Sequence, residues 1–524
     1  MEGLRYVLAI DMGSSSVKAT LVSNRGDLAG SGLEHIDILL LPGGGAEQDP
    51  EQWWRAAMSA AKSALAEAQV AAERIVALVC TTQWAVTVPV DRDGHALSNA
   101  VTWMDTRGGR YSRAASAGWP RAEGYAVSKL LQWIRLTGAA PTHSGVDGFG
   151  HVLYFKFERP ELYAQSYKFL EPMDYINARL TGKCAASYST IFPYWLTDNR
   201  NPNRIEYHPA LLRLAGIDRE KMPDLMPVNA VLGTVKKEVA AELGLAEGTR
   251  VVMGSGDSHA ATIGAGCVRD FEGYFCVGTT AWLSCHVPFK KTDVSHTLNT
   301  MPAALPGRYI VGAEQGTAGR CLEFLKNNIL FPANGQNGDL YEILNREAGQ
   351  VSAGSDGLIF TPWINGVLAP GEDPYTRSAF FNQTARTTRA HYIRAVMEGV
   401  AFNLRWLKGH VEKFIGRRFP ALNFIGGGAS SEIWCQVQAD ILGCPVRRIA
   451  NARNANAVGA ALAAFSSLGE LSLEDITAIV KVARTYEPDP KNARVYDQQF
   501  REFLEFYKRM KPIYKRLNPI VHPV

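Results

Sequence analysis

The sequence predicts an α/β protein in which two domains of similar plan share one site. The first observation is size, because 524 residues with 46% hydrophobic content can fill two or three separate cores. The second is a repeat: a strand, a turn of Gly and hydroxyl residues and a returning strand occur at 6–22 and again at 273–287. The third is the stretch 250–266, where an apolar run ends in glycines and an aspartate, as at the carboxyl end of a strand in an open α/β sheet.

Composition argues against several other classes of protein. The net charge is +4 and the Lys and Arg residues are dispersed, so we expect neither a nucleic-acid surface nor a membrane surface. No apolar run is long enough to cross a bilayer and the first residues lack the pattern of a secretion signal, so the cytoplasm is the expected location. The eight cysteines form neither C-x-x-C pairs nor Cys/His clusters, which favours reduced thiols over a zinc site.

The first strand-turn-strand unit has the features of a phosphate-binding loop. Tyr6–Ile10 and Val17–Val22 are the expected strands, and Asp11-Met12-Gly13-Ser14-Ser15-Ser16 is the turn between them. Backbone N–H groups and hydroxyls that converge on one point suit an anion, and Lys18 adds a positive charge nearby. Asp11 is placed to hold a magnesium ion through water. Taken alone, the unit has an ordinary hairpin as its alternative.

The second unit makes the phosphate-loop interpretation stronger. Gly273–Val277 and Ala281–Val287 are again apolar strands, and Gly278-Thr279-Thr280 is again a turn of Gly and hydroxyl residues. Two such loops, one opening each half of the chain, are what a two-domain protein needs to grip a polyphosphate from both sides.

Asp257 follows the strand predicted at Val251–Met253. Gly254 and Gly256 let the backbone turn tightly before a segment of small residues that can start a helix. A carboxylate at the end of such a strand can face a ligand rather than a core. For an isolated G-D-S, an Asp that caps the following helix is the alternative.

Polar and aromatic residues gather on two stretches of the first half. Gln83 and Trp84 follow the strand predicted at Ile75–Cys80, and Trp103 and Asp105 lie in the stretch 100–107. A carboxylate and an indole can hydrogen-bond hydroxyls while stacking on the face of a sugar. Structural roles, including an exposed salt bridge in the second stretch, are the alternative.

Capping residues predict where several helices begin. Asp49 is expected to cap a helix with Pro50 in its first turn, and Gln52 is expected to reach back to the cap. Thr388 is expected to cap a long amphipathic helix. In the second half we also expect a strand at 422–425, a glycine turn at 426–431 that a nucleotide could approach, a helix at 432–442 and a packed core helix at 456–465.

Together these stretches resemble the FGGY family of carbohydrate kinases. The resemblance is carried in order by AIDMGSSSVKA, EQDPEQWW, VTWMDTR, EPMDYINARLTG, GLAEGTRVVMGSGDSHAATIGAG, FCVGTT, NGVLAPGEDPYTRSAFFNQTARTTRAHYIRAVMEGVAFNL and FIGGGASSEIWCQVQADILGCPV. It implies an α/β fold of two ribonuclease-H-like (actin-like ATPase) domains with the active site in the cleft between them. Residues 1–265 would be the N-terminal sugar-binding domain, 266–470 the C-terminal ATP-binding domain, and 471–524 a helical tail packed on the domains.

The resemblance implies a role for each matching residue. Asp257 matches the general base that accepts the proton of the attacking sugar hydroxyl, and Asp11 with Asp257 would hold Mg²⁺ through water. The sugar contacts would be Gln83, Trp84, Trp103, Asp105, Tyr125 and Asp257. The contacts of ATP would be Asp11, Gly13, Ser14, Ser15, Lys18, Gly278, Thr279, Gly319, Gly427, Gly428 and Ser431.

Two departures from the family pattern limit what the resemblance implies. Relatives that act on glycerol carry Arg-Glu where this chain has Gln83-Trp84, and xylulose kinases typically carry Met-His there. Glycerol is therefore disfavoured as the substrate, and xylulose is not established as the substrate. The G-E-R-x-P loop is altered to Gly371-Glu372-Asp373-Pro374 after an extended lead. The substrate class is therefore a sugar or polyol of unspecified identity, and the sequence leaves a homodimer open.

Two other functions stay open at this point. One is an actin-like nucleotide-dependent binding or regulatory protein, because the same architecture serves chaperones, filaments and sensors. The other is a kinase homologue without sugar kinase activity. A pure nucleotide switch would not need Asp257 together with Trp103 and Asp105, and this combination favours the kinase.

Overall fold

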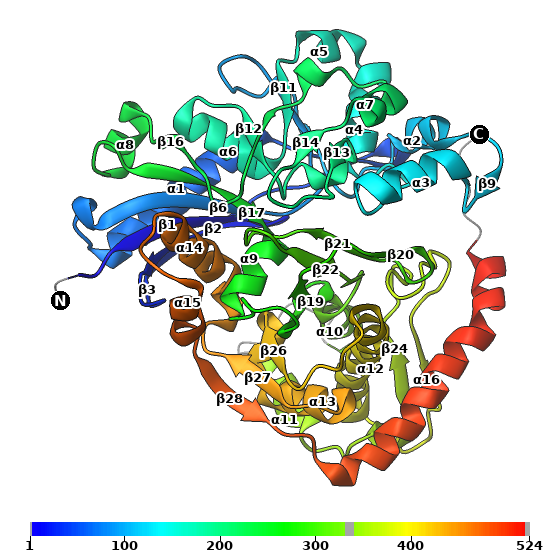
Figure 1. The fold of residues 1–524 in the computed structure, drawn as a ribbon. Coiled ribbons are helices and arrows are strands. Elements are labelled where there is room, and N and C mark those ends of the chain that lie inside the picture. Colours follow the sequence, from blue (N-terminus) through cyan, green and yellow to red (C-terminus); the bar gives the residue numbers. More distant parts are fainter. Residues whose placement is uncertain (1–2, 331–339, 519–524) are drawn as a thin grey trace.

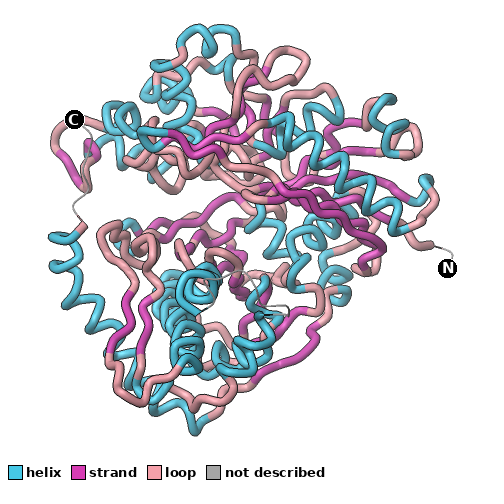
Figure 2. Tube along the Cα trace, turned by 180° about the vertical axis from the view of Figure 1, so that it is seen from behind, coloured by secondary structure: helices cyan, strands magenta, loops and turns pink. Residues whose placement is uncertain are grey.

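The computed structural model describes residues 3–330 and 340–518, which form two bodies, each built on a large sheet (Figure 1). The first sheet lies in the upper body of Figure 1, and from behind it is seen as a twisted band of strands (Figure 2). Its strands, in order across the sheet, are β16 (Val231–Thr234), β17 (Arg250–Gly256), β6 (Ile75–Thr82), β1 (Tyr6–Met12), β2 (Ser16–Ser23) and β3 (Leu28–His35). Helices α1 (Pro50–Ala68), α6 (Pro172–Thr181) and α8 (Lys237–Leu243) share one apolar core with this sheet.

The second sheet lies in the lower body. Its strands, in order, are β20 (Thr292–Asp293), β21 (Leu298–Pro302), β22 (Tyr309–Gly312), β19 (Ala281–Val287), β18 (Gly273–Val277), β26 (Leu422–Ile425), β27 (Val446–Ile449) and β28 (Val482–Tyr486), with β23 (Glu314–Gln315) beside β19. The helices of this body are α10 (Gly319–Leu325), α11 (Leu340–Ala348), α12 (Arg389–Ile415), α13 (Glu432–Leu442) and α16 (Pro490–Leu517), and all five contribute to its core.

The two sheets share one topology, which confirms the predicted duplication. In the first sheet β1 pairs antiparallel with β2 and parallel with β6, and β6 pairs parallel with β17, whose other neighbour β16 is antiparallel. In the second sheet β18, β19, β26, β27 and β28 repeat these relations in the same order. The predicted strands at 273–277, 281–287 and 422–425 coincide with β18, β19 and β26.

The predicted starts of α1 and α12 are confirmed, but the predicted hydrogen bond from Gln52 to the α1 cap is wrong. Asp49 accepts a hydrogen bond from the backbone N–H of Glu51, and Pro50 opens α1. Thr388 caps α12 in a capping box whose second member is His391. Gln52 does not reach back to the α1 cap, because its amide instead donates to Asp37 Oδ2 (2.8 Å), which lies in the loop after β3.

Helices α9 (Asp257–Gly264) and α14 (Ala455–Ser467) pack against each other between the two sheets (Figure 1). The contact is made by glycines, since a Cβ on Gly459 would lie 1.9 Å from the carbonyl oxygen of Ala260 and one on Gly264 would lie 1.8 Å from that of Ala455. The apolar residues of α14 pack on β1, β6 and β17 of the first sheet, so the predicted core helix is confirmed.

Four helices between residues 127 and 215 form a helical layer on the first body. Its helices are α3 (Val127–Leu136), α4 (Gly148–Glu158), α5 (Pro160–Gln165) and α7 (Pro209–Ala215). Large aromatic side chains, including Trp133, Phe149 and Phe192, fill its core, and Met301 and Ile310 from the second sheet join them. The two bodies therefore share an apolar contact beside the site.

The last part of the chain completes the second body. After α14 it adds the short helix α15 (Leu473–Ile479), the edge strand β28 and the long helix α16, so the segment expected as a helical tail also contributes a strand. Tyr496 of α16 accepts a hydrogen bond from Arg394 and donates one to Glu398, both on α12. Within 3–330 and 340–518, no helix combines the length and the apolar character that a membrane span requires.

Candidate active site

Asp257 is the first residue of α9, directly after β17 ends at Gly256. Gly256 occupies the N-cap position and offers no side-chain cap, so Asp257 is not the capping residue of this helix. Its Oδ1 accepts a hydrogen bond from the backbone N–H of Ser258 (2.6 Å). Burial and the nearby negative charge of Asp11 raise the pKa of Asp257 from its ordinary 3.8 to about 7. A carboxylate with such a pKa can take up and release a proton near neutral pH.

Asp11 lies at the same edge of the first sheet. It pairs with Thr81 of β6, and Thr81 pairs with Ser255 of β17, so the three residues form one row across parallel strands. Burial raises the pKa of Asp11 to about 6, although the charge of Lys18 and a hydrogen bond from Asn456 act in the opposite direction. Asp11 and Asp257 therefore lie at the same end of the first sheet, and the charge of Asp11 contributes to the raised pKa of Asp257. A hydrated divalent cation would offset the negative charge of two such carboxylates.

The first phosphate loop is the tight turn between β1 and β2. The N–H of Gly13 donates to the carbonyl of Ser16 (2.9 Å), and the carbonyl of Ser14 accepts from Gln48 Nε2 (2.8 Å). Lys18 Nζ donates to Oδ1 of Asn454 (3.2 Å), the N-cap residue of α14. The turn is thus fixed from both sides, and Lys18 is placed between Asp11 and α14.

The second phosphate loop is bound to the start of α10. The N–H of Gly319 donates to the carbonyl of Gly278 (2.8 Å), and the N–H of Ala318 donates to that of Thr279 (3.0 Å). A Cβ on Gly319 would lie 2.4 Å from the Gly278 carbonyl oxygen, so this approach requires glycine. The structure brings the predicted nucleotide residues Gly278, Thr279 and Gly319 together.

The glycine turn after β26 contains the other predicted nucleotide contacts. Gly427 has open space where a side chain would be, whereas Gly428 packs on Val277, 2.9 Å from the position of a Cβ. The hydroxyl of Ser431 accepts from the N–H of Trp434 and donates to Asn345 Oδ1 (2.6 Å), so it caps α13. Gly427 offers the backbone surface that a flat ligand could approach.

Gln83 and Trp84 directly follow β6, beside Asp257. Gln83 is 5% exposed and its amide donates to Gln48 Oε1 (2.9 Å). The half-buried indole of Trp84 stacks on Phe192 with ring centroids 5.7 Å apart and meets His259 edge-on at 5.8 Å. A Cβ on Gly256 would lie 3.7 Å from Trp84 Cδ1, so the indole lies next to the backbone that carries Asp257.

Trp103 and Asp105 differ in exposure and in the partners that they contact. Trp103 is 39% exposed, and its Nε1 donates to Ser14 Oγ (3.1 Å), which links it to the first phosphate loop. Asp105 is 0% exposed: it pairs with Arg107 (2.6 Å) and accepts from the N–H of Ala46 (2.9 Å). A direct sugar contact of Asp105 stays a prediction, and in this structure the carboxylate holds Arg107 instead.

Tyr125 lies in the short strand β10 (Tyr125–Ala126) and packs against the core of the helical layer. Its hydroxyl donates to the carbonyl of Pro141 (2.6 Å), and its ring lies against His143 with centroids 3.9 Å apart. Burial and the charges of Asp147 and Glu372 raise the pKa of Tyr125, and Glu372 belongs to the altered loop of the second body. A sugar contact of Tyr125 stays a prediction.

The altered loop is fastened to the C-terminal helix. Asp373 is 1% exposed, its Oδ1 accepts from the N–H of Tyr375 (3.0 Å), and Lys511 of α16 lies 3.7 Å from its other oxygen. Tyr507 of α16 donates to the carbonyl of Gly371 (3.3 Å). The loop is therefore a fixed part of the second body.

Several residues at the site were not singled out by the sequence. Gln48 bridges Gln83 and Ser14, Asn456 donates to Asp11 Oδ2 (3.5 Å), and Glu314 adds a negative charge near Asp257. Gln48 and Asn456 lie in segments that the sequence predicts as helix start and core helix. Only the tertiary fold brings them to the phosphate loop.

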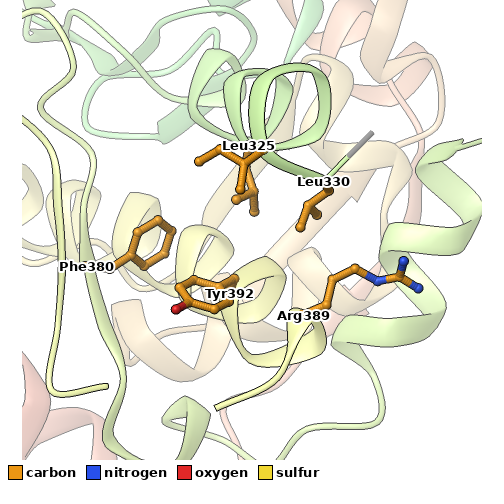
Figure 3. Close-up of a pocket in the computed structure, with 6 residues that line it drawn as sticks. Leu325, Leu330, Phe380, Arg389 and Tyr392 are labelled. Carbon is orange, nitrogen blue, oxygen red and sulfur yellow. The ribbon is translucent and has the colours of Figure 1, made fainter. Parts of the chain in front are cut away.

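A separate cavity of about 500 Å³ lies in the second body (Figure 3). Its lining is mainly apolar, and consists of Leu325, Ile329, Leu330, Phe380, Arg389 and Tyr392. None of the predicted site residues lines it, and Arg389 is paired with Glu347. We assign the chemistry to the Asp11–Asp257 region and not to this cavity.

Comparisons with known proteins agree with this geometry. Residues 6–264 match the N-terminal domain of the FGGY family of carbohydrate kinases, and residues 273–468 match its C-terminal domain. The chain is 27% identical over 516 residues to a xylulose kinase of Staphylococcus epidermidis, covering 97% of each protein. It is 24% identical over 530 residues to a gluconokinase of Bacillus subtilis, covering 98% of this chain and 96% of that protein.

The fold is shared with solved structures. A gluconate kinase from Lactobacillus acidophilus superimposes with a TM-score of 0.85 at 23% identity, covering 98% of this chain and 100% of that one. Together, the two family models span most of the sequence in the predicted order. The chain therefore belongs to the FGGY family of carbohydrate kinases.

Proposed function

We propose that this chain transfers the γ-phosphoryl group of ATP to a hydroxyl of a sugar, either a ketose such as xylulose or ribulose or a polyol. The observation that carries the proposal is Asp257, a carboxylate at a strand end with a pKa raised to about 7 and a second carboxylate, Asp11, beside it. The xylulose kinase and gluconokinase relatives support the reaction class and leave the acceptor open.

Asp257 acts as the general base in this proposal. Its carboxylate accepts the proton of the attacking hydroxyl while that oxygen bonds to the γ-phosphorus and the bond to the β-phosphate oxygen breaks, so ADP leaves. The proton then passes from Asp257 to solvent. Mg²⁺, when held through water by Asp11 and Asp257, offsets the charge on the phosphate oxygens.

The phosphates would be held by the two turns. Ser14 and Ser15 offer hydroxyls and backbone N–H groups from the first body, and Gly278 and Thr279 offer theirs from the second. Both turns are already fixed by backbone hydrogen bonds, so little ordering is needed when the ligand binds.

The acceptor would lie against two indoles. Trp84 and Trp103 present apolar faces beside Asp257 and Ser14, and such faces suit the C–H face of a sugar. Gln83 would orient a hydroxyl, and Asp105 would act through Arg107. A cytoplasmic location and a homodimer stay expectations of this proposal.

A coupled assay of ATP consumption tests the proposal. Purified enzyme is screened against pentuloses, hexuloses, aldonates and small polyols, with Asp257→Asn as the matched control. We expect turnover with at least one neutral sugar or polyol in the parent and loss of that turnover in the variant. If no acceptor raises ATP consumption above the background without acceptor, the proposal is wrong.

A further inference from the structure

Glu314 brings a third carboxylate to the site, and it comes from the second body. It lies in β23, directly opposite Trp282 of β19, and β19 begins immediately after the second phosphate loop. None of the family motifs in the sequence singles it out. Its position depends on the pairing of two strands that are separated by about thirty residues.

The side chain of Glu314 is on the face of the sheet that looks toward α9. Residues directly opposite each other in an antiparallel pair project to the same face. The indole N–H of Trp282 donates to Tyr274 OH (2.9 Å), and Tyr274 OH donates to the carbonyl of Ser258 (2.7 Å), the residue after Asp257. This chain of contacts joins the strand opposite Glu314 to the start of α9.

The carboxylate of Glu314 has no protein partner in the described part of the chain. Its backbone carbonyl accepts from the N–H of Ala369 (3.1 Å), whereas its exposed side chain makes neither a hydrogen bond nor an ion pair within 3–330 and 340–518. The surrounding protein limits its hydration enough to raise the pKa of Glu314 to about 7. The charge of Glu314 in turn contributes to the raised pKa of Asp257.

Two cations beside predicted site residues are already engaged. Lys18 donates to Asn454, and Arg107 is held by Asp105 and Glu47, 2.6 and 2.7 Å from its Nη2. Arg107 is therefore neutralised by two carboxylates, whereas Lys18 keeps its positive charge, which acts on Asp11. An acceptor that carries its own carboxylate would have to lie near the negative charges of Asp257 and Glu314, which repel it.

On the basis of the proposed kinase function, we propose that Glu314 is a specificity residue for the sugar. Its carboxylate accepts a hydrogen bond from a hydroxyl of an uncharged ketose or polyol, and it disfavours anionic acceptors such as aldonates. The acceptor would therefore be contacted by both bodies, with Trp84 and Asp257 from the first body and Glu314 from the second.

The test is the ratio of kcat/KM for a neutral acceptor to that for the aldonate of the same carbon number, measured at a pH of about 8. In Glu314→Gln we expect this ratio to fall by about ten-fold or more, mainly through a higher KM for the neutral acceptor and a lower KM for the aldonate. A change in the pKa of Asp257 alters both acceptors alike and leaves the ratio unchanged. Glu487→Gln, an exposed carboxylate beyond β28 at the far edge of the same sheet, is the control and should leave the ratio unchanged.

Two results would overturn the assignment of Glu314 while the kinase function stood. One is a parent enzyme that prefers the aldonate, and the other is a ratio that Glu314→Gln leaves within two-fold of the parent. Calorimetric titration of the same two acceptors without ATP gives the answer independently of turnover. If the parent phosphorylates nothing, the proposed function fails, and the titration still decides whether Glu314 distinguishes neutral from anionic sugars.

Discussion

At the scale of single residues, the site is defined by carboxylates that are difficult to ionise together. Asp257, Asp11 and Glu314 come from three separate segments, and limited hydration raises the pKa of each, to about 7, about 6 and about 7 respectively. The protonated form of these carboxyls is therefore favoured in the folded protein up to a pH of about 6 to 7. Catalytic readiness is therefore linked to a cost in stability at high pH.

The first prediction concerns this cost. The folded pKa of Asp257 is raised from 3.8 to about 7, so its favourable contribution is fully present below about 3.8 and is lost as the pH rises through 7. In the absence of Mg²⁺, Asp257→Asn should have a higher Tm than the parent at a pH of about 8. The difference should shrink towards a pH of about 4, and thermal melts across this range measure it. A variant that is less stable than the parent at the higher pH would contradict the raised pKa.

The second prediction concerns Asp105, which sequence reasoning placed against the sugar. Because Asp105 is fully buried and pairs with Arg107, Asp105→Ala leaves a partly buried guanidinium and the N–H of Ala46 with fewer partners. We expect a loss of about 3 kcal/mol in the free energy of unfolding, measured in urea. Glu206→Ala removes an exposed ion pair with Arg204 and should cost less than about 1 kcal/mol. Equal effects of the two changes would show that Asp105 is not a structural anchor.

At the scale of elements, local sequence patterns predicted strands and helix caps, because interactions between residues close in the sequence determine these features. The strands β18, β19 and β26 and the cap of α12 follow from short apolar runs, glycine turns and one hydroxyl. The partner of Gln52 and the position of Glu314 depend on segments that are distant in the sequence, and no local pattern encodes them. Asp105 shows the same limit, because its complete burial and its hydrogen bond from Ala46 depend on a distant segment that no local pattern indicates.

The third prediction concerns the contact of α9 with α14. Because a Cβ on Gly459 would lie 1.9 Å from the Ala260 carbonyl oxygen, Gly459→Ala must push α9 away and shift Asp257 at its start. We expect a loss of about 1–3 kcal/mol in stability together with a lower kcat. Gly409→Ala, in α12 with open space around it, should instead stabilise the protein by about 1 kcal/mol. Stabilisation by both changes would contradict the close helix contact.

At the scale of the whole molecule, the two bodies contribute different parts of one site. In the proposed site, the first body would supply Asp11, Asp257 and the indoles, and the second would supply Thr279, Gly319 and Glu314. The duplicated sheets place one hairpin turn in each body, and in the proposed function these two turns hold the phosphates of ATP from opposite sides. The aromatic cluster that includes Met301 forms an apolar contact between the two bodies.

The fourth prediction follows from this division. Thr279→Val removes a hydroxyl from the second phosphate loop and leaves the first body unchanged, so the KM for ATP should rise by about ten-fold or more. The affinity for the sugar, measured by calorimetry without nucleotide, should stay within two-fold of the parent. A parallel loss of affinity for both ligands would point to a folding defect instead of a separate ATP body.

The most direct test of the central claim is the turnover of Asp257→Asn. The change preserves the shape of the side chain and removes the proton acceptor, so we expect kcat to fall by about three orders of magnitude or more. Calorimetry should find ATP and the sugar bound within a few-fold of the parent affinity. A variant that binds both ligands and keeps kcat within a few-fold of the parent would show that Asp257 is not the general base.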